Sequence, residues 1–259
     1  MTRFYDVLKK SKFIHLSIII VYYLLVVLPH EEVGKFIAKA FSDMSRDQYN
    51  FIILIVTLLG LAVYLLPIGW NIIRKRSRVK TALYLFANVF LAVLCFKLLF
   101  VVNVEAIHFI QYGVLAVLLF PLLNSYWKTA FWCMILGALD EAWQYFYLAP
   151  QRTNYYDFND VIINTIGAGF GLIYIHSYGL MSQSQNKLFK SKEFYFSILF
   201  AIGTLALYAA GYLIRKPMTG FWQTVHPHVT YHVVYPVEGL LIVALLILFY
   251  CGLDRMYEE

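Results

Sequence analysis

Charged residues are scarce in this chain. Asp, Glu, Lys and Arg make up 14% of its 259 residues, whereas soluble domains contain about a quarter. Hydrophobic residues make up 61%. A chain with this balance has too little charge to cover a soluble surface, so the composition places it among the integral membrane proteins.

Cysteine is also scarce, and a cleavable leader is not expected. Its three cysteines, Cys95, Cys133 and Cys251, lie within apolar runs without metal-ligand spacing, so we expect buried packing residues and no metal. The first apolar run follows a basic segment, as in a signal peptide, but residues 27–30 offer no small-x-small cleavage site. We therefore expect this run to be retained as a membrane span.

Long apolar runs recur along the whole chain. A helix needs about 20 apolar residues to cross a bilayer. Runs of about this length predict eight transmembrane helices, at residues 13–29, 51–70, 82–102, 108–123, 128–148, 160–178, 194–214 and 236–253. The predicted fold class is therefore all-α, a polytopic membrane protein with a single membrane domain over residues 1–259.

Basic residues gather in alternate connections between these runs. Of the 21 Lys and Arg residues, 14 lie in the set of connections that includes both termini, six lie in the other set, and Lys97 lies inside a span. Because Lys and Arg collect on the cytoplasmic side, we predict that both termini are cytoplasmic and that residues 149–159 face outward. Orientation thus explains the net charge of +6, and we expect no nucleic-acid partner.

Polar side chains gather near the outer ends of the third to sixth runs. They are Lys97, Glu105, His108, Tyr112, Asp140, Glu141, Gln144, Arg152, Asp157, Asp160 and Asn164. Ionisable groups at membrane depth are costly and usually face a protein interior or a wet cavity. This layer is therefore the predicted site.

Helical spacing arranges part of this layer into two stripes. They are Gly137, Glu141 and Gln144 on the fifth run, and Asp160, Asn164, Gly167 and Gly171 on the sixth. Glycines at such spacing let helix backbones approach closely in lipid. We therefore predict that the two stripes pack together and bring Asn164 close to Glu141 or Gln144.

The order and spacing of these residues resemble the signature of the VanZ-like family. The matching pattern is His108-Phe109-x-x-Tyr112-Gly113, Glu141-x-x-Gln144, Pro150-x-Arg152 and Asp160-x-x-x-Asn164-x-x-Gly167-x-x-x-Gly171. It covers about residues 105–175, within a family core at approximately 105–178. The stretch from Arg152 to Asp160 is about two residues longer than the family pattern, which leaves open whether Asp157 matches a family acid.

The resemblance implies a role at the bacterial cell envelope. The family takes its name from proteins associated with low-level resistance to teicoplanin-type glycopeptides, which act outside the cytoplasmic membrane. It implies a multi-pass protein of the bacterial cytoplasmic (inner) membrane. The implied partner is a membrane lipid or a lipid-linked envelope precursor. No cofactor is expected, and the reaction and the oligomeric state are left open.

Our preferred hypothesis is an outward-facing pocket that binds or modifies an anionic lipid or envelope-linked group. The candidate catalytic residues are Glu141 and His108, as acid–base groups, and Asp160, which would orient one of them. The candidate substrate-binding residues are Arg152, Gln144, Asn164, Lys97, Tyr112 and Asp157. The planar fork of an arginine suits a phosphate group.

Two alternatives remain open at this point. In a proton- or ion-coupled transporter the same acids would bind protons or substrate, although neither half of the chain holds a second copy of the pattern. In a non-catalytic envelope scaffold the polar residues would be a buried clasp between helices. The group of His226, His228, His232 and Glu238 matches no zinc spacing, so we expect an outer-loop role without metal.

Overall fold

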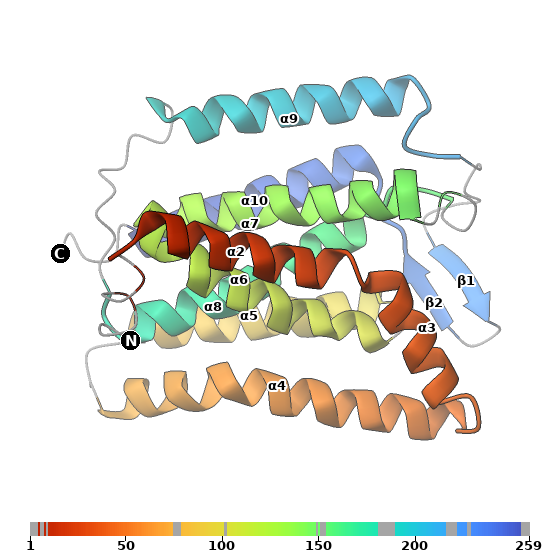
Figure 1. Cartoon of the computed structure of the whole chain (residues 1–259), viewed down its shortest axis with the longest axis horizontal. Helices are drawn as coiled ribbons and strands as arrows, with labels where there is room; N and C mark the ends of the chain where they lie inside the picture. The colour runs from red at the N-terminus through yellow and green to blue at the C-terminus, as the bar shows by residue number, and fades with distance from the viewer. Residues whose placement is uncertain are drawn as a thin grey trace.

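Helices occupy all eight positions that the apolar runs predict (Figure 1). The computed structural model describes residues 10–74, 79–100, 103–148, 154–180, 190–215, 222–226 and 229–254, with Tyr5, Leu8 and Pro150. The predicted helices are α2 (Lys12–Val27), α4 (Arg46–Arg74), α5 (Val79–Leu98), α6 (Ile107–Leu123), α7 (Tyr126–Trp143), α8 (Phe158–Ser177), α9 (Lys192–Ala209) and α10 (Pro236–Asp254). The all-α fold class is confirmed.

Five of these helices are long and apolar enough to cross a membrane by length and composition, namely α4, α5, α8, α9 and α10. Helices α2 and α6 are apolar but shorter, with 16 and 17 residues. Helix α7 carries the charged residues Lys128, Asp140 and Glu141. The chain is therefore a multi-pass membrane protein of helices, and the full count of eight spans stays a prediction.

Hydrogen bonds join the ends of helices that are far apart in sequence. His15, near the start of α2, lies 2.7 Å through Nε2 from the carbonyl oxygen of Leu118 in α6. Asp254, the last residue of α10, accepts hydrogen bonds from the backbone N–H groups of Tyr126 and Trp127, at 2.9 and 3.0 Å. The start of α2, the end of α6, the start of α7 and the end of α10 therefore share one end of the bundle.

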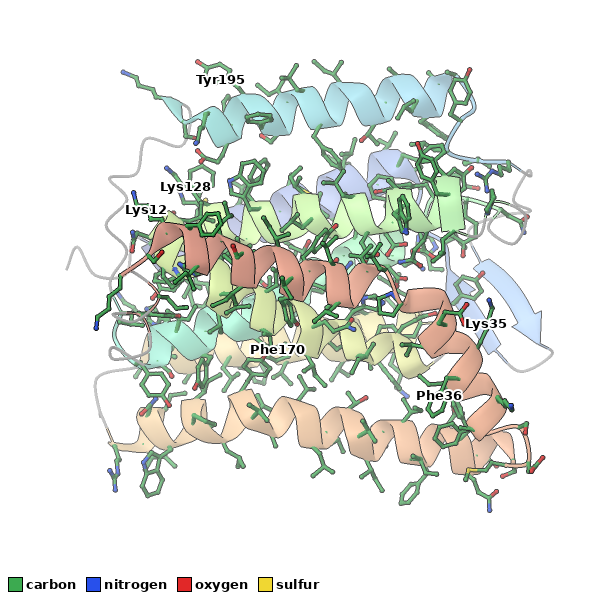
Figure 2. The ribbon with its side chains drawn as sticks, in the orientation of Figure 1. Lys12, Lys35, Phe36, Lys128, Phe170 and Tyr195 are labelled. Carbon is green, nitrogen blue, oxygen red and sulfur yellow. The ribbon has the colours of Figure 1, made fainter. Side chains whose placement is uncertain are left out.

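This end is the basic end of the molecule, where Lys12 and Lys128 lie on the left of Figure 2. The opposite end, the polar end, holds two elements that the apolar runs do not predict. Helix α3 (His30–Ala40) is amphipathic, and strands β1 (Trp222–His226) and β2 (Val229–His232) pair as an antiparallel hairpin (Figure 1). These segments are too short or too polar to form apolar runs.

Helix α8 lies at the centre of the bundle. Its apolar window is 89% buried within the protein, against 17% for α4 and 11% for α9. Small residues permit this burial: a Cβ atom on Gly167 would lie 2.8 Å from the carbonyl oxygen of His108 and 2.9 Å from Cα of Phe109. One turn later Gly171 lies against the carbonyl group of Gly113. Helices α6 and α8 therefore touch through their backbones.

The predicted partner of this glycine stripe is wrong. Gly167 and Gly171 face α6, whereas we predicted that they face α7. Asn164, from the same predicted stripe, does meet α7, because a Cβ on Gly137 would lie 3.0 Å from both Cβ and Nδ2 of Asn164. Helix α8 packs between α6 and α7, so Asn164 and Gly167, three positions apart, face different helices.

Replacing Gly167 with alanine should destabilise the protein. The added methyl group meets backbone atoms of α6, which cannot rotate away, so the helices must separate at an expected cost of about 1–3 kcal/mol. We expect a lower melting temperature in detergent. Gly203 in α9 is the matched control, because a Cβ there meets nothing within 4 Å and alanine favours a helix. Equal melting temperatures for the two variants would contradict the close α6–α8 packing.

Candidate functional site

Four carboxyl groups gather at the polar end, where α7 ends and α8 begins. Asp140 and Glu141 are 0% and 3% exposed, Asp157 is the N-cap of α8, and Asp160 lies in its first turn. Asp160, Asp140 and Asp157 lie close enough to Glu141 for each of them, when ionised, to repel its carboxylate. Among the described residues none of the four forms an ion pair. We name these four residues the acid cluster.

Uncharged side chains donate hydrogen bonds to Asp140 and Glu141, the two members of the acid cluster on α7. The hydroxyl group of Tyr112 donates to Oδ2 of Asp140 at 3.2 Å. The side-chain amide of Gln144 donates to Oδ1 of Asp140 at 3.1 Å and to Oε1 of Glu141 at 3.3 Å. Asp140 belongs to the predicted polar layer but was given no catalytic or binding role, because neighbouring side chains on a helix diverge. Gln144 reaches both acids, since they lie four and three positions before it.

The local backbone at Gln144 is also unusual. From Gln144 to Leu148 the helix continues as a π-helix, a rare form that is frequent at functional sites. Tyr156, in the following segment, donates through its hydroxyl group to the carbonyl oxygen of Ala138 at 2.5 Å. These features bring the segment before α8 back against α7.

Asn164 is completely buried and unsatisfied. It is 0% exposed, and neither its Oδ1 nor its Nδ2 forms a hydrogen bond with any described residue, including Glu141 and Gln144. Leaving a buried polar group without a partner costs about 1–3 kcal/mol. Such a group in a folded protein calls for an explanation, for example a bound water or ligand. The predicted separation of at most about 5 Å from Glu141 or Gln144 stays a prediction.

The remaining predicted residues lie at different places. His108 is buried near the start of α6, with its ring centroid 6.2 Å from that of Tyr112. Lys97 lies in the last turn of α5 with an exposed side chain and no ion pair within the described chain. Glu105, in the short 3-10 helix η1 (Asn103–Ala106), is close enough for its charge to act on Glu141. Arg152 lies outside the described residues.

Arg215 is a residue that the sequence analysis overlooked. Its guanidinium group donates to the carbonyl oxygens of Pro150, at 2.5 Å, and Tyr145, at 2.7 Å, and lies 3.8 Å over the ring of Tyr145. Its backbone N–H donates to the carbonyl oxygen of Asn154 at 2.8 Å. Arg215 therefore anchors both sides of the connection that carries Arg152. The sequence gives one sign of this residue, which is its basic charge directly after the predicted outer end of the seventh span, residues 194–214.

Asn159 is a second overlooked residue. Its side-chain amide donates to the carbonyl oxygens of Leu99, at 3.1 Å, and His232, at 2.8 Å. Its Oδ1 accepts a hydrogen bond from the N–H of Val234 at 2.9 Å. Asn159 therefore ties the start of α8 to the end of α5 and to the segment between β2 and α10.

The second histidine group also lies at the polar end. His232 Nε2 lies 2.8 Å from Oε1 of Glu238, and the side chains of His226 and His228 lie outside the described residues. Within the described chain, no group of three or more His, Cys, Asp and Glu side chains is arranged to hold a metal ion.

Asp157 has an unusual acidity for a helix cap. Its Oδ1 accepts a hydrogen bond from the N–H of Asn159 at 2.9 Å, which satisfies one free donor at the start of α8. Burial and then the neighbouring charge of Asp160 raise the pKa of Asp157 to about 8. Asp157 therefore keeps its proton through most of the neutral range.

Comparison with known proteins bears on this region directly. A family model described as VanZ/LLP1 matches residues 51–181, just over half of the chain. The match runs from α4 to just beyond α8, so it includes α4 and α5 as well as the segment whose motif was recognised in the sequence. No curated protein and no solved structure matches the chain.

Replacing Asp157 with asparagine should change how stability depends on pH. The folded protein holds the proton of Asp157 up to about pH 8, whereas the unfolded chain releases it near pH 3.8. The contribution of Asp157 to the free energy of unfolding is therefore greatest below about pH 4, and it decreases as the pH rises to about 8. Asparagine keeps the cap and cannot ionise. We expect similar melting temperatures near pH 4 and a higher one for the variant at pH 9.

The quantity to measure is the difference in melting temperature between the variant and the wild type at each pH, because groups far from Asp157 titrate in both proteins. Asp160 would lose a repulsive neighbour in the variant, which acts in the same direction. A variant that is less stable than the wild type at pH 9, by differential scanning fluorimetry in detergent, would contradict the protonated cap.

Proposed function

The chain belongs to the VanZ/LLP1 family, and we propose that it binds or modifies an anionic lipid or lipid-linked group at the outer face of the bacterial cytoplasmic membrane. One observation carries the proposal: α7 and α8 bury the acids Asp140 and Glu141 and the unsatisfied Asn164 toward the polar end of the bundle. If these groups served only to hold the helices together, they would form hydrogen bonds with one another. A ligand with its own donors and acceptors would satisfy them instead.

The acid cluster is suited to proton transfer. Carboxyl groups held close together repel one another when ionised, and proton exchange with a ligand relieves this repulsion. We assign Glu141 as the acid–base group, with His108 as the second candidate and Asp160 as the residue that orients one of them. Tyr112, Gln144, Asn164 and Asp157 are assigned to ligand binding.

An apolar cavity beside the cluster favours a lipid as the ligand. It has a volume of about 250 Å³, lies between α7 and α9, and is lined by residues that include Ala142, Phe146, Tyr156 and Leu207. An acyl chain in this cavity would hold its headgroup near the polar end. Arg152, in the connection anchored by Arg215, and Lys97, exposed at the end of α5, are the proposed partners of an anionic headgroup.

The proposed orientation places the polar end outside and both termini in the cytoplasm. It rests on the distribution of basic residues, which are concentrated at the basic end. We expect a cysteine at the exposed Asn154 to react with a membrane-impermeant thiol reagent in intact cells, and a cysteine at the exposed Lys190 to stay unreactive. The three native cysteines are replaced by alanine in both variants. The reverse labelling pattern would move the acid cluster to the cytoplasm.

Glu141→Gln should separate function from folding. The substitution keeps the shape of the side chain and the position of the acceptor for Gln144, and it removes the ability to transfer a proton. We expect normal accumulation in the membrane, with at least a hundredfold loss of lipid turnover if the group acts in catalysis, as is typical for acid–base residues. Turnover is followed by mass spectrometry of envelope lipids incubated with the purified protein.

Glu238→Gln is the matched control, because Glu238 lies at the same end and pairs with His232. It should leave lipid turnover unchanged. If neither wild type nor variant modifies a lipid, retention of anionic lipid during purification is the second measurement, and Asn164→Leu should lower it. Wild-type turnover in Glu141→Gln together with wild-type retention in Asn164→Leu would refute the proposed site.

A further inference from the structure

A second cavity lies away from the acid cluster, along α9. It has a volume of about 410 Å³, in the range of about 300–1,000 Å³ that is typical of ligand sites, and it lies between α9, α7 and α10. Its wall is mostly apolar and includes Phe131, Met134, Ala201 and Val243. Helix α9 runs along the edge of the bundle and is otherwise largely exposed (Figure 1).

The basic end of this cavity carries two buried polar groups that lack hydrogen bonds. Trp127 is 3% exposed, and its indole N–H finds no acceptor among the described residues. Glu193 is 2% exposed, and its Oε2 accepts no hydrogen bond in the described chain, although it lies 3.7 Å from Nζ of Lys128. Trp127 and Glu193 both line the cavity. A donor and an acceptor are therefore available to a ligand.

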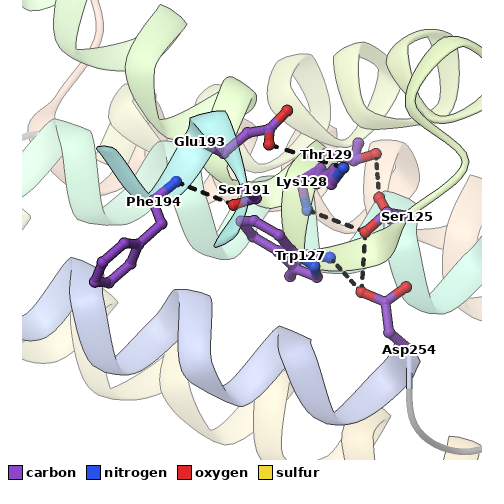
Figure 3. A network of polar contacts seen from close by, with 8 residues as sticks. All are labelled: Ser125, Trp127, Lys128, Thr129, Ser191, Glu193, Phe194 and Asp254. Atoms are coloured by element: carbon purple, nitrogen blue, oxygen red, sulfur yellow. Dashed lines mark hydrogen bonds and ion pairs between the residues drawn. The ribbon is translucent and has the colours of Figure 1, made fainter. Parts of the chain in front are cut away.

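Hydrogen bonds hold this polar rim in place (Figure 3). The carboxylate of Asp254 accepts from the backbone N–H of Trp127 at 3.0 Å, which anchors the start of α7. The hydroxyl oxygen of Ser191 accepts from the N–H of Phe194 at 3.1 Å, which caps the start of α9. The two helix starts that carry Trp127 and Glu193 are thus fixed independently of any ligand.

Lysines outnumber carboxylates around the rim, with Lys128, Lys190 and Lys192 against Glu193 and Asp254. Lys128 lies within the rim, and Lys190 and Lys192 are exposed at the start of α9. Lysines near a membrane surface attract anionic lipid headgroups. The buried N–H of Trp127 requires an acceptor, which a phosphate or ester oxygen supplies. An apolar cavity that ends in lysines, an indole N–H without an acceptor and a carboxylate oxygen held only by a 3.7 Å ion pair matches the chemistry of an anionic, hydroxyl-bearing phospholipid.

We propose that the cavity between α7, α9 and α10 binds one phospholipid with an anionic, hydroxyl-bearing headgroup, from the leaflet at the basic end. One acyl chain fills the cavity. A phosphate oxygen accepts from the indole N–H of Trp127 and pairs with Lys128, and a headgroup hydroxyl donates to Oε2 of Glu193. The bound lipid completes the packing of α9 against the bundle. This site is independent of the proposed function, which concerns the opposite end.

The test uses the full-length protein, delipidated in detergent and titrated with dioleoyl phosphatidylglycerol in mixed micelles. Binding is measured by native mass spectrometry and by the shift in melting temperature. We expect one phosphatidylglycerol to bind roughly tenfold more tightly than dioleoyl phosphatidylcholine, the equivalent of one hydrogen bond to a charged group. Glycerol 3-phosphate should not shift the melting temperature. Equal binding of the two lipids, or a full shift with glycerol 3-phosphate, would overturn the proposal.

Two variants locate the site. Trp127→Phe keeps the ring and removes the N–H group, and it should weaken phosphatidylglycerol binding roughly tenfold without lowering stability in the absence of lipid. Ala201→Phe fills the cavity and should abolish binding, whereas Ala206→Phe, at an exposed position of the same helix, should not. If Ala201→Phe fails to fold, Trp127→Phe decides the question.

Glu141→Gln serves as the control for the other site and should bind phosphatidylglycerol here as the wild type does. Wild-type affinity in Trp127→Phe would refute the assignment.

Discussion

The direct backbone contact between α6 and α8 is the constraint on which the rest of the structure depends. Within a bilayer, lipid is as apolar as a helix surface, so close packing must hold helices together. Gly113, Gly167 and Gly171 provide that packing, because none of them has a side chain to separate the helices. The contact puts α8 at the centre. It also sets the start of α6, where His108 lies, against Gly167 in the middle of α8.

Two asparagines on α8 differ in how far their side-chain amides are satisfied by hydrogen bonds. Asn159 uses both ends of its amide, in three hydrogen bonds to the backbone of other segments, and therefore acts as an anchor. Asn164 is equally buried, but it makes none within the described chain. Asn88 on α5 resembles Asn159, since it donates to Ile166 and accepts from Tyr250. Buried amides in this bundle are satisfied where they serve packing, so Asn164 stands apart.

Much of the fold could be predicted from the sequence, because long apolar runs depend only on local composition. All eight helices lie where those runs place them. The helix partners could not be predicted, since a glycine stripe shows that a close neighbour exists without showing which helix it is, and Gly167 faces α6 rather than α7. In the candidate site, helical spacing identified Glu141 and Gln144. It gave Asp140 no role, and it overlooked Arg215, whose contact with Tyr145 joins segments 70 residues apart.

The central claim is that the polar end holds a ligand site rather than a closed clasp. A cryo-electron microscopy map of the protein, extracted into native nanodiscs without detergent, tests it most directly. We expect non-protein density within hydrogen-bonding distance of the Asn164 amide and beside Glu141. A map in which Asn164 and the acid cluster are bonded only to one another and to protein, with no such density, would contradict it.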